Sequence, residues 1–591
     1  MRRIDEGWVA RSMVSGAVVV VILMVVDCGL IWFSNEHFFA PDHAATLVLG
    51  WVGFVALSCL LSALIGRVFR RSIPHWGFLA VGAAAGGQLA VQLVDPLVWV
   101  IGACIGWAFA AWFPKGSSVS RSVALVVGWC AVHIVLGSAG TVEAKSVLPD
   151  VVVVTIDTVR EDALSSSSNA LIAGLTPNLD VLASEGCSIG DAVSTSPLTG
   201  PSHAAMFSGL HPLDMGLFQN AKQLPDGIPW LPETLDEQGY QTAAFVSSAM
   251  LDADLGYSRG FDLYDDDLAG DRFLRLSALG FIFEKSRLVK KQKFARKGQQ
   301  TVKRMQRWLR TVNPNQPVFV WLHLYDAHRP YQATLESRRF VKDAPLDLPS
   351  PESFPQWKPM SLEAKPSALP NLFDELSGGG AETPLKGTTN ELSRRYLAGV
   401  RDLDGIVGAA WTALDAERNP QKRVWSVLAD HGESLTEHGE LGSHQYNVYE
   451  ANIRVPYLLS KGPCPENPVS TTTLSSTILE RAGVDLEWKT HLSIEAVVRA
   501  GKGAPSHASS VKVARRTNGE KVILGFKGED LFFSEVYDLS NDPHEQHPSE
   551  GNRTVIDAMA NGVRAKLEGA QPTESSDDSV MEGLRALGYV D

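Results

Sequence analysis

The segment VVVVTID at residues 151–157 is a run of β-branched residues that ends in a carboxylate. Such an apolar run indicates a strand that is buried on both faces, as in a parallel sheet covered by helices. A second apolar segment, VLADHGE at residues 427–433, ends in Asp430, His431 and a further acidic residue. Open α/β sheets bind ligands at the carboxyl ends of their strands. Because carboxylate and imidazole groups are common ligands of divalent cations, the two segments predict one metal site.

Alternating strands and helices extend outward from these two segments. A helix is expected from Pro177 to Glu185, with Thr176 as its N-cap and Gly186 at its end. Further strands are expected over residues 242–246, 318–324 and 424–428. This alternation predicts a doubly wound α/β catalytic domain, for which we expect the boundaries 149–505.

The C-terminal part of the chain has a different pattern. Short strands expected over residues 521–526 and 531–537 predict a small α+β subdomain at 506–591. Residues 332–390 are rich in Pro, Ser and Gly and show little periodicity. A loop of that length is usually functional or disordered, and here we expect it to cover the site.

The first 145 residues have the composition of a membrane region. Each of their apolar runs approaches the roughly 20 residues needed to cross a bilayer, and the runs cover approximately 12–33, 44–66, 77–94, 97–113 and 122–139. Lys and Arg residues precede the first run and follow the second and the fourth. The positive-inside rule therefore predicts five transmembrane helices with a cytoplasmic N-terminus. We expect a multi-pass protein of the plasma (inner) membrane with an extracytoplasmic catalytic domain.

Charge and cysteine content limit the classes of partner and site. The chain of 591 residues has a net charge of −13, which gives no reason to expect nucleic-acid binding. A basic segment at residues 284–310 is interpreted as the solvated face of a helix, with contact to anionic lipid headgroups as the alternative. Four of the six cysteines lie in the apolar runs, and only Cys187 and Cys464 remain. A disulfide between these two is possible, but their spacing does not establish it.

The segment PLTGPSHAAMFSG at residues 197–209 places a hydroxyl group before a Gly-Pro turn and an expected helix. Backbone N–H groups and the helix dipole favour an anion at such a position. Thr199 can coordinate a metal there, be deprotonated by it and act as a nucleophile. The alternative is an ordinary helix start in which Thr199 or Ser202 serves as the cap.

Taken together, these segments resemble the sulfatase family of the alkaline phosphatase superfamily, over residues 149–591. The matching motifs occur in order along the chain, and they are DTVR at 157–160, TPNLD at 176–180, TGPSHA at 199–204, HLYDAHRPY at 323–331, DHGE at 430–433, GSH at 442–444, YDL at 537–539 and LRALGY at 584–589. The resemblance implies an alkaline-phosphatase-like doubly wound sheet behind the transmembrane region. It also departs from the family pattern, because Thr199 stands where typical sulfatases have a cysteine that is oxidised to formylglycine. The other departures are Thr158 for a second Asp, His203 for an Arg and His444 for a Lys.

The resemblance implies a role for each matching residue. One divalent cation (Ca, Mn, Zn or Mg) is expected on the metal ligands Asp157, Thr199, Asp430 and His431. The expected catalytic residues are Thr199, His328 and His444, and the expected substrate-binding residues are His203, His328, His444 and Arg160. His203 is interpreted as positioning the site rather than binding metal. An alternative is a second metal on His444 with Asp326 or His328.

The threonine also constrains the reaction. A hydrated aldehyde can expel sulfate by collapse of its own carbon centre, whereas a threonine ester needs attack at sulfur or phosphorus. We therefore expect a hydrolase that cleaves a sulfate or phosphate ester through a covalent threonine intermediate. A phosphoethanolamine or phosphoglycerol transferase acting on a lipid or glycan is the first alternative, and a catalytically inactive membrane scaffold is the second. Retention of all four expected metal ligands argues against the scaffold.

Overall fold

The computed structural model describes residues 148–268, 295–346, 348, 353–354, 389–435, 437–439, 442–499 and 511–569. These residues belong to one of the two compact units into which the chain divides. The five expected transmembrane runs, the basic segment before residue 295, most of the 332–390 loop and the motif at 584–589 lie outside the described residues. In the described part of the chain, no helix combines the length and the apolar character that a membrane span needs.

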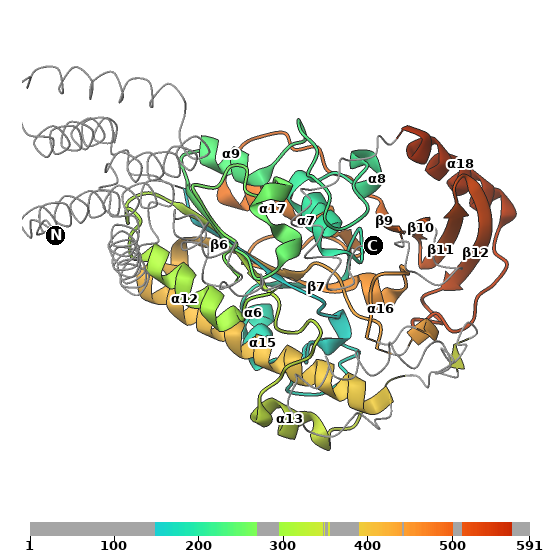
Figure 1. The fold of residues 1–591 in the computed structure, drawn as a ribbon, viewed down its shortest axis with the longest axis horizontal. Helices are drawn as coiled ribbons and strands as arrows, with labels where there is room; N and C mark the ends of the chain where they lie inside the picture. The colour runs from blue at the N-terminus through green and yellow to red at the C-terminus, as the bar shows by residue number, and fades with distance from the viewer. Residues whose placement is uncertain are drawn as a thin grey trace, which may run out of the picture. The chain divides into compact units, whose positions relative to one another are not determined.

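The core of the described unit is an eight-stranded sheet with the order β4-β3-β5-β1-β6-β7-β2-β8 (Figure 1). The bounds of its strands are β1 (Asp150–Ile156), β2 (Cys187–Val193), β3 (Gln241–Phe245), β4 (Leu263–Asp265), β5 (Val318–Leu324), β6 (Arg423–Ala429), β7 (Arg454–Leu459) and β8 (Val469–Ser470). The first five strands in this order run parallel, whereas β7 is antiparallel to both β6 and β2. The sheet is therefore mixed rather than wholly parallel. The four strands expected in the catalytic domain are confirmed within one residue at each end.

The strand β1 lies at the centre of the sheet because both of its faces are apolar. All seven of its residues are buried, and so are all seven of β5 and of β6 on either side. Its register places Ile156 beside Leu324 of β5 and Ala429 of β6. The carboxyl ends of these three strands thus meet at one edge of the sheet.

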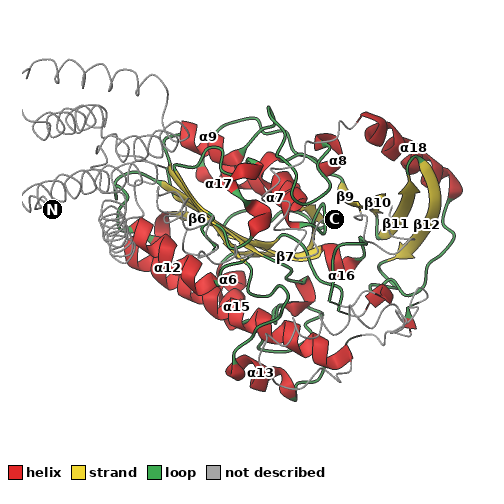
Figure 2. Cartoon of the chain, viewed as in Figure 1, coloured by secondary structure: helices red, strands yellow, loops and turns green. Residues whose placement is uncertain are grey.

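Helices cover both faces of this sheet (Figure 2). On one face lie α6 (Pro177–Glu185), α12 (Gly298–Leu309), α13 (Leu335–Lys342) and α15 (Thr389–Glu417). The other face carries α7 (Thr199–Ser208), α9 (Leu231–Glu237) and α17 (Leu474–Ala482), with the short helix α8 (Pro212–Met215) nearer the C-terminal sheet. The short helix α16 (Glu450–Ile453) directly precedes β7. This layering confirms the α/β fold class.

Two predicted helix starts have different outcomes. The helix α6 has the expected bounds, with Thr176 before it and Gly186 after it, but the Thr176 hydroxyl makes no capping bond and contacts Ser165 instead. The helix α7 begins at Thr199, and its N-cap position is occupied by Leu198. The alternative in which Thr199 or Ser202 caps this helix is therefore wrong, because Thr199 already lies in the first turn.

A second, antiparallel sheet follows in the order β12-β11-β10-β9. Its elements are β9 (Ile494–Arg499), β10 (Val511–Thr517), β11 (Glu520–Lys527), β12 (Asp530–Asp538) and the helix α18 (Arg553–Gly569). Apolar residues of α18, among them Ile556, Met559 and Val563, pack in one buried cluster with residues of these strands. The two expected C-terminal strands are confirmed, while β9 already precedes residue 506, so the domain boundary at that position stays a prediction.

One covalent link ties distant parts of the main sheet together. Cys187 at the start of β2 and Cys464 after β7 form a disulfide, with their Cα atoms 5.7 Å apart. The pairing that the sequence left open is therefore present in the structure.

Candidate active site

The carboxyl ends of β1 and β6 bring together three of the predicted metal ligands. Asp157 follows β1, and Asp430 and His431 follow β6, on neighbouring parallel strands. All three side chains are fully buried. The Nε2 atom of His431 lies 3.8 Å from Oδ1 of Asp157 and 3.6 Å from Oδ2 of Asp430. The three ligand atoms lie within 4.8 Å of one another, close enough to share one ion.

Thr199 completes this cluster from the first turn of α7. Its Oγ1 atom lies 3.5 Å from Nε2 of His431, and the residue is 2 % exposed. The same helix is fixed against the end of β6, because the hydroxyl of Ser202 donates to the carbonyl of Asp430 at 2.7 Å. The helix start therefore holds the predicted nucleophile at the predicted metal site.

Several buried oxygens of the cluster have no hydrogen-bond donor. Neither carboxylate oxygen of Asp157 accepts a hydrogen bond in the described structure, and Oδ2 of Asp430 accepts none. Burial raises the pKa of Asp157 to about 7, although His431 opposes the shift. Burial and the nearby Asp157 also raise the pKa of Asp430. Unpaired buried carboxylates are costly, so this donor set fits a divalent cation.

The imidazole of His431 is oriented as a metal ligand. Its Nδ1–H donates to the carbonyl of Gly432 at 3.0 Å, which leaves the lone pair of Nε2 facing the carboxylates. Metal-binding histidines commonly donate their second ring nitrogen to a backbone carbonyl in this way. Burial lowers the pKa of His431, but Asp430 and Asp157 outweigh it and raise the pKa above its ordinary value.

The two histidines predicted to act on substrate lie beside this cluster. The ring centroids of His431 and His444 are 4.3 Å apart, and those of His444 and His328 are 5.2 Å apart. A buried carboxylate orients His444, because Oε1 of Glu433 lies 3.0 Å from its Nδ1. Burial lowers the pKa of both His328 and His444 well below the ordinary histidine value. Glu433 belongs to the DHGE motif but had no role assigned from the sequence.

His203 contacts the cluster through backbone and side-chain groups beside the candidate metal ligands. Its two ring nitrogens contact the Thr199 carbonyl at 2.8 Å and the Thr155 hydroxyl at 2.9 Å. Nδ1 also lies 3.8 Å from Oδ2 of Asp430. These contacts agree with the predicted positioning role, whereas a direct contact with substrate stays a prediction.

Arg160 lies in a different set of contacts. Its guanidinium forms ion pairs with Asp162 and Glu437, both at 2.7 Å, and its side chain is 4 % exposed. The same group donates to the carbonyl of Glu433. All three guanidinium nitrogens are thus engaged within the protein, and substrate binding by Arg160 stays a prediction.

One proposed partner of a second metal, Asp326, is engaged elsewhere. Oδ2 of Asp326 accepts a hydrogen bond from the backbone N–H of Gly298, at the start of α12, at 2.8 Å. This contact turns Asp326 toward that helix. Of the alternatives considered for a second metal, the structure brings together only His328 and His444.

Sequence reasoning assigned no separate role to His323. This residue lies on β5, is fully buried, and places Nε2 3.4 Å from Oδ2 of Asp157. A polar residue within the apolar run 318–324, near the carboxyl end of an expected parallel strand, was the signal that could have identified it.

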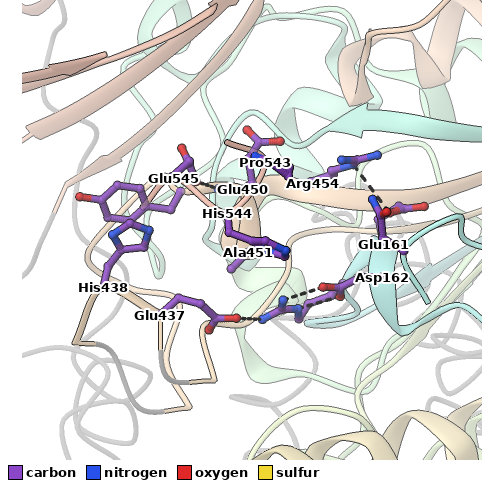
Figure 3. A pocket seen from close by; sticks show the side chains of 13 residues that line it. Glu161, Asp162, Glu437, His438, Glu450, Ala451, Arg454, Pro543, His544 and Glu545 are labelled. Carbon is purple, nitrogen blue, oxygen red and sulfur yellow. Dashed lines mark hydrogen bonds and ion pairs between the residues drawn. The ribbon is translucent and has the colours of Figure 1, made fainter. Parts of the chain in front are cut away.

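A surface cavity adjoins Arg160 but contains none of the predicted metal ligands (Figure 3). Its walls carry ion pairs between Arg160 and Asp162 and between Arg454 and Glu161. On its other side, Glu450 and Glu545 both pair with the buried Lys521 of β11. Ion pairs therefore line this cavity, and those of Lys521 connect β11 of the C-terminal sheet to α16, which directly precedes β7 of the main sheet.

Comparison with known proteins gives consistent matches over the described unit. The family model described as Sulfatase matches residues 149–484. Arylsulfatase K of Homo sapiens is 25% identical over 405 residues, covering 62% of this chain and 73% of that protein. A sulfatase of Formosa agariphila is 23% identical over 490 residues, covering 75% of this chain and 91% of that protein.

Two solved structures share the fold. One, determined in complex with its substrate D-glucosamine-2-N,6-O-disulfate, has a TM-score of 0.54 at 16% identity and covers 73% of this chain and 100% of that chain. The phosphonate monoester hydrolase of Agrobacterium radiobacter has a TM-score of 0.53 at 18% identity, covering 71% of this chain and 95% of that chain. At these identities the likeness shows a common fold.

Proposed function

The chain belongs to the sulfatase family of ester hydrolases, and from this premise we propose that it is a metal-dependent enzyme whose nucleophile is Thr199. One observation carries the proposal. The Thr199 hydroxyl lies 3.5 Å from Nε2 of His431, in a buried cluster where both oxygens of Asp157 and Oδ2 of Asp430 lack hydrogen-bond donors in the described structure. A hydroxyl in that position is placed for activation rather than for helix capping.

Asp157, Asp430, His431 and Thr199 would hold the cation. When bound, a divalent cation lowers the pKa of an adjacent hydroxyl and stabilises negative charge on the transferred group. The imidazole of His431 suits Zn, whereas the carboxylates and the hydroxyl suit Ca, Mn or Mg, so the ligand set is compatible with any of the four.

The reaction follows from the positions of the side chains. The Thr199 oxygen attacks the sulfur or phosphorus in line, and the bond from that atom to the leaving alcohol oxygen breaks. His444 or His328, whose lowered pKa keeps the ring neutral at the outset, takes up the proton that Thr199 loses and passes it to the leaving oxygen. Water then attacks the same sulfur or phosphorus, the bond to the Thr199 oxygen breaks, and the threonine oxygen regains a proton. The contact between Glu433 and Nδ1 of His444 leaves Nε2 of His444 to exchange the proton.

The substrate is proposed to be a sulfate or phosphate ester. A threonine ester must be resolved at sulfur or phosphorus, and phosphoryl centres react readily in this way. The five apolar runs of residues 1–145 favour a second candidate, a transferase in which an acceptor alcohol on a lipid or glycan replaces water.

We place the catalytic domain outside the cytoplasm of a multi-pass membrane protein. The disulfide between Cys187 and Cys464 supports this location, because disulfides persist in oxidising compartments.

The test uses the purified full chain with chromogenic sulfate, phosphate monoester and phosphodiester substrates. Thr199→Ala should lower kcat at least about a thousandfold, as removal of a nucleophile does, while metal remains bound. Ser208→Ala, which removes a hydroxyl from the other end of α7, serves as the matched control and should keep its activity. Full activity in Thr199→Ala would contradict the assignment. Turnover without any lipid favours the hydrolase over the transferase, and high-resolution mass measurement of trapped Thr199 distinguishes sulfate from phosphate.

A further inference from the structure

The buried His323 faces Oδ2 of Asp157, whereas His431 faces Oδ1 of the same carboxylate. We propose that His323 is a positioning residue whose Nε2–H holds Oδ2 of Asp157 and thereby presents Oδ1 to the cation. This inference rests on the metal site proposed above. It adds a residue that neither binds the metal nor touches substrate.

The protonation of the His323 ring follows from its neighbour. The backbone N–H of Ser247 donates to Nδ1 of His323 at 3.4 Å. An imidazole nitrogen that accepts a hydrogen bond carries no proton, so in the neutral ring Nε2 carries it. A protonated nitrogen has no lone pair for a metal. His323 is therefore a donor toward the site, although it lies among groups that would otherwise suit a cation.

The donor and its acceptor face each other in a closed environment. Nε2 of His323 lies 3.4 Å from Oδ2 of Asp157, and both residues are fully buried. Neither atom forms a hydrogen bond in the described structure, with each other or with a third group. The backbone N–H of Asp157 donates to the carbonyl of Leu324 at 2.9 Å, which fixes the spacing of the two strands. A small rotation of either side chain completes a hydrogen bond between them.

The two carboxylates of the site then use their oxygens in the same way. Oδ1 of Asp430 accepts the backbone N–H groups of Thr158 and His431, at 3.2 and 2.8 Å, and its Oδ2 has no donor. In Asp157, Oδ2 faces His323, whereas Oδ1 lies on the side of His431. Each aspartate thus has one oxygen for a protein donor and one for the cation.

The donor to His323 is itself held by a buried arginine. The backbone N–H of Arg296 donates to the Ser247 carbonyl at 3.0 Å, and its Nε donates to the Thr301 hydroxyl at 2.9 Å. The Ser247 and Thr301 hydroxyls are hydrogen-bonded at 2.7 Å. Arg296 is 4 % exposed and forms an ion pair with Asp265 at 2.9 Å. Arg296 is thus a buried support for the site, whereas Lys303 and Arg307 of α12 are exposed, as expected for the solvated face of a helix.

The experiment titrates the metal-free full chain with Mn²⁺ or Zn²⁺ alone and measures the Kd by calorimetry. His323→Ala should weaken binding about tenfold to a hundredfold, as loss of a partner of a metal ligand does. His323→Gln should stay within about threefold of the parent, because the glutamine amide also donates. His211→Asn is the matched control, since His211 is equally buried outside the site and caps α8 through Nδ1. Its metal affinity should be unchanged.

Melting temperatures of the metal-free variants separate positioning from a purely structural role. A His323→Ala variant that melts lower but binds metal as the parent does would overturn the inference. So would a His323→Gln variant as weak as His323→Ala, because that result identifies His323 as a ligand. If His323→Ala does not fold, a loss of about tenfold or more in folded His323→Gln overturns the inference, and retained affinity upholds it. Absence of metal binding in the parent would instead refute the proposed metal site itself.

Discussion

Thr158 stands where the sulfatase family pattern has a second Asp, and it contacts the site through its backbone N–H. Thr158 has φ 59°, a left-handed conformation that is unfavourable for a β-branched residue. In this conformation its N–H donates to Oδ1 of Asp430. The hydroxyl of Tyr396 donates to the Thr158 carbonyl at 2.9 Å and accepts the N–H of Arg160 at 2.9 Å, which holds the turn. Such a conformation costs on the order of 1–3 kcal/mol, and here it orients Asp430, a proposed metal ligand.

Asp430 is the residue at which this orientation can be tested. Asp430→Asn keeps the size of the side chain but removes the charge. We expect metal affinity to fall by more than the roughly hundredfold that loss of an outer partner costs, as measured by calorimetric titration.

Asp404→Asn is the control for a buried aspartate outside the site. Asp404 accepts the N–H groups of Asn178 and Leu179 at the start of α6. This variant should lower the free energy of unfolding by about 1 kcal/mol through a weaker helix start. Its metal affinity should remain that of the parent. An Asp430→Asn variant that behaves like Asp404→Asn would remove Asp430 from the ligand set.

At the level of elements, one histidine joins α8, β9 and α18. His491 lies 3.5 Å from Asp214 of α8 and 3.6 Å from Glu495 of β9. Asp214 in turn pairs with Lys566 of α18 at 2.9 Å, and Glu495 pairs with Arg515 of β10. The ion pairs of His491 with Asp214 and Glu495 require a positive charge on His491, so the stability that they contribute should vary with pH.

The direction of this pH dependence follows from the pKa shifts of His491 and Glu495. Burial lowers the pKa of His491, but Asp214 and Glu495 outweigh it and raise the pKa to about 8. The stabilisation is therefore complete below the ordinary value of 6.5 and is lost as the pH rises through about 8. Burial opposes ionisation of Glu495, but His491 lowers its pKa to about 2, so its contribution is present above pH 4.5 and is lost as the pH falls through about 2.

His491→Gln should flatten the fall in Tm between pH 6.5 and about 8. The measurement is thermal unfolding of both proteins across that range at constant ionic strength. An equally steep fall in the variant would show that another group is responsible.

At the scale of the whole described unit, a buried lysine links the two sheets. Lys521 of β11 is fully buried and pairs with Glu450 of α16 at 3.0 Å and with Glu545 at 2.7 Å. The cavity in Figure 3 opens beside these carboxylates. Removing the lysine would leave the buried Glu545 without its cation, whereas Glu450 would keep only Arg516, whose Nη1 lies 3.3 Å from its Oε2.

Lys521→Met should therefore lower the free energy of unfolding by about 3–5 kcal/mol, the typical result of breaking a buried ion pair from one side. Denaturant unfolding monitors the loss. The triple variant Lys521→Met, Glu450→Gln, Glu545→Gln should regain most of it, because no uncompensated charge remains. A loss below about 1 kcal/mol in the single variant would mean that water reaches the carboxylates.

Local sequence determined the strands that build the site. The apolar runs ending at Asp157 and Asp430 depend on side-chain hydrophobicity within a few residues, and so do the bounds of α6. The motifs that contain Asp157, Thr199, Asp430 and His431 lie within the residues 149–484 that the Sulfatase family model matches. These features are readable because each is set by neighbours in the chain.

Only the tertiary structure decided how those strands are paired and what each polar atom contacts. The antiparallel β7, the engagement of Arg160 by Asp162 and Glu437, and the approach of His323 to Asp157 all join residues far apart in sequence or in different motifs. Such contacts depend on strand neighbours, on register and on side-chain direction in the packed core. Hydrophobic periodicity carries no information about them, so the sequence predicted the candidate ligands and the packing determined how each of these side chains is held.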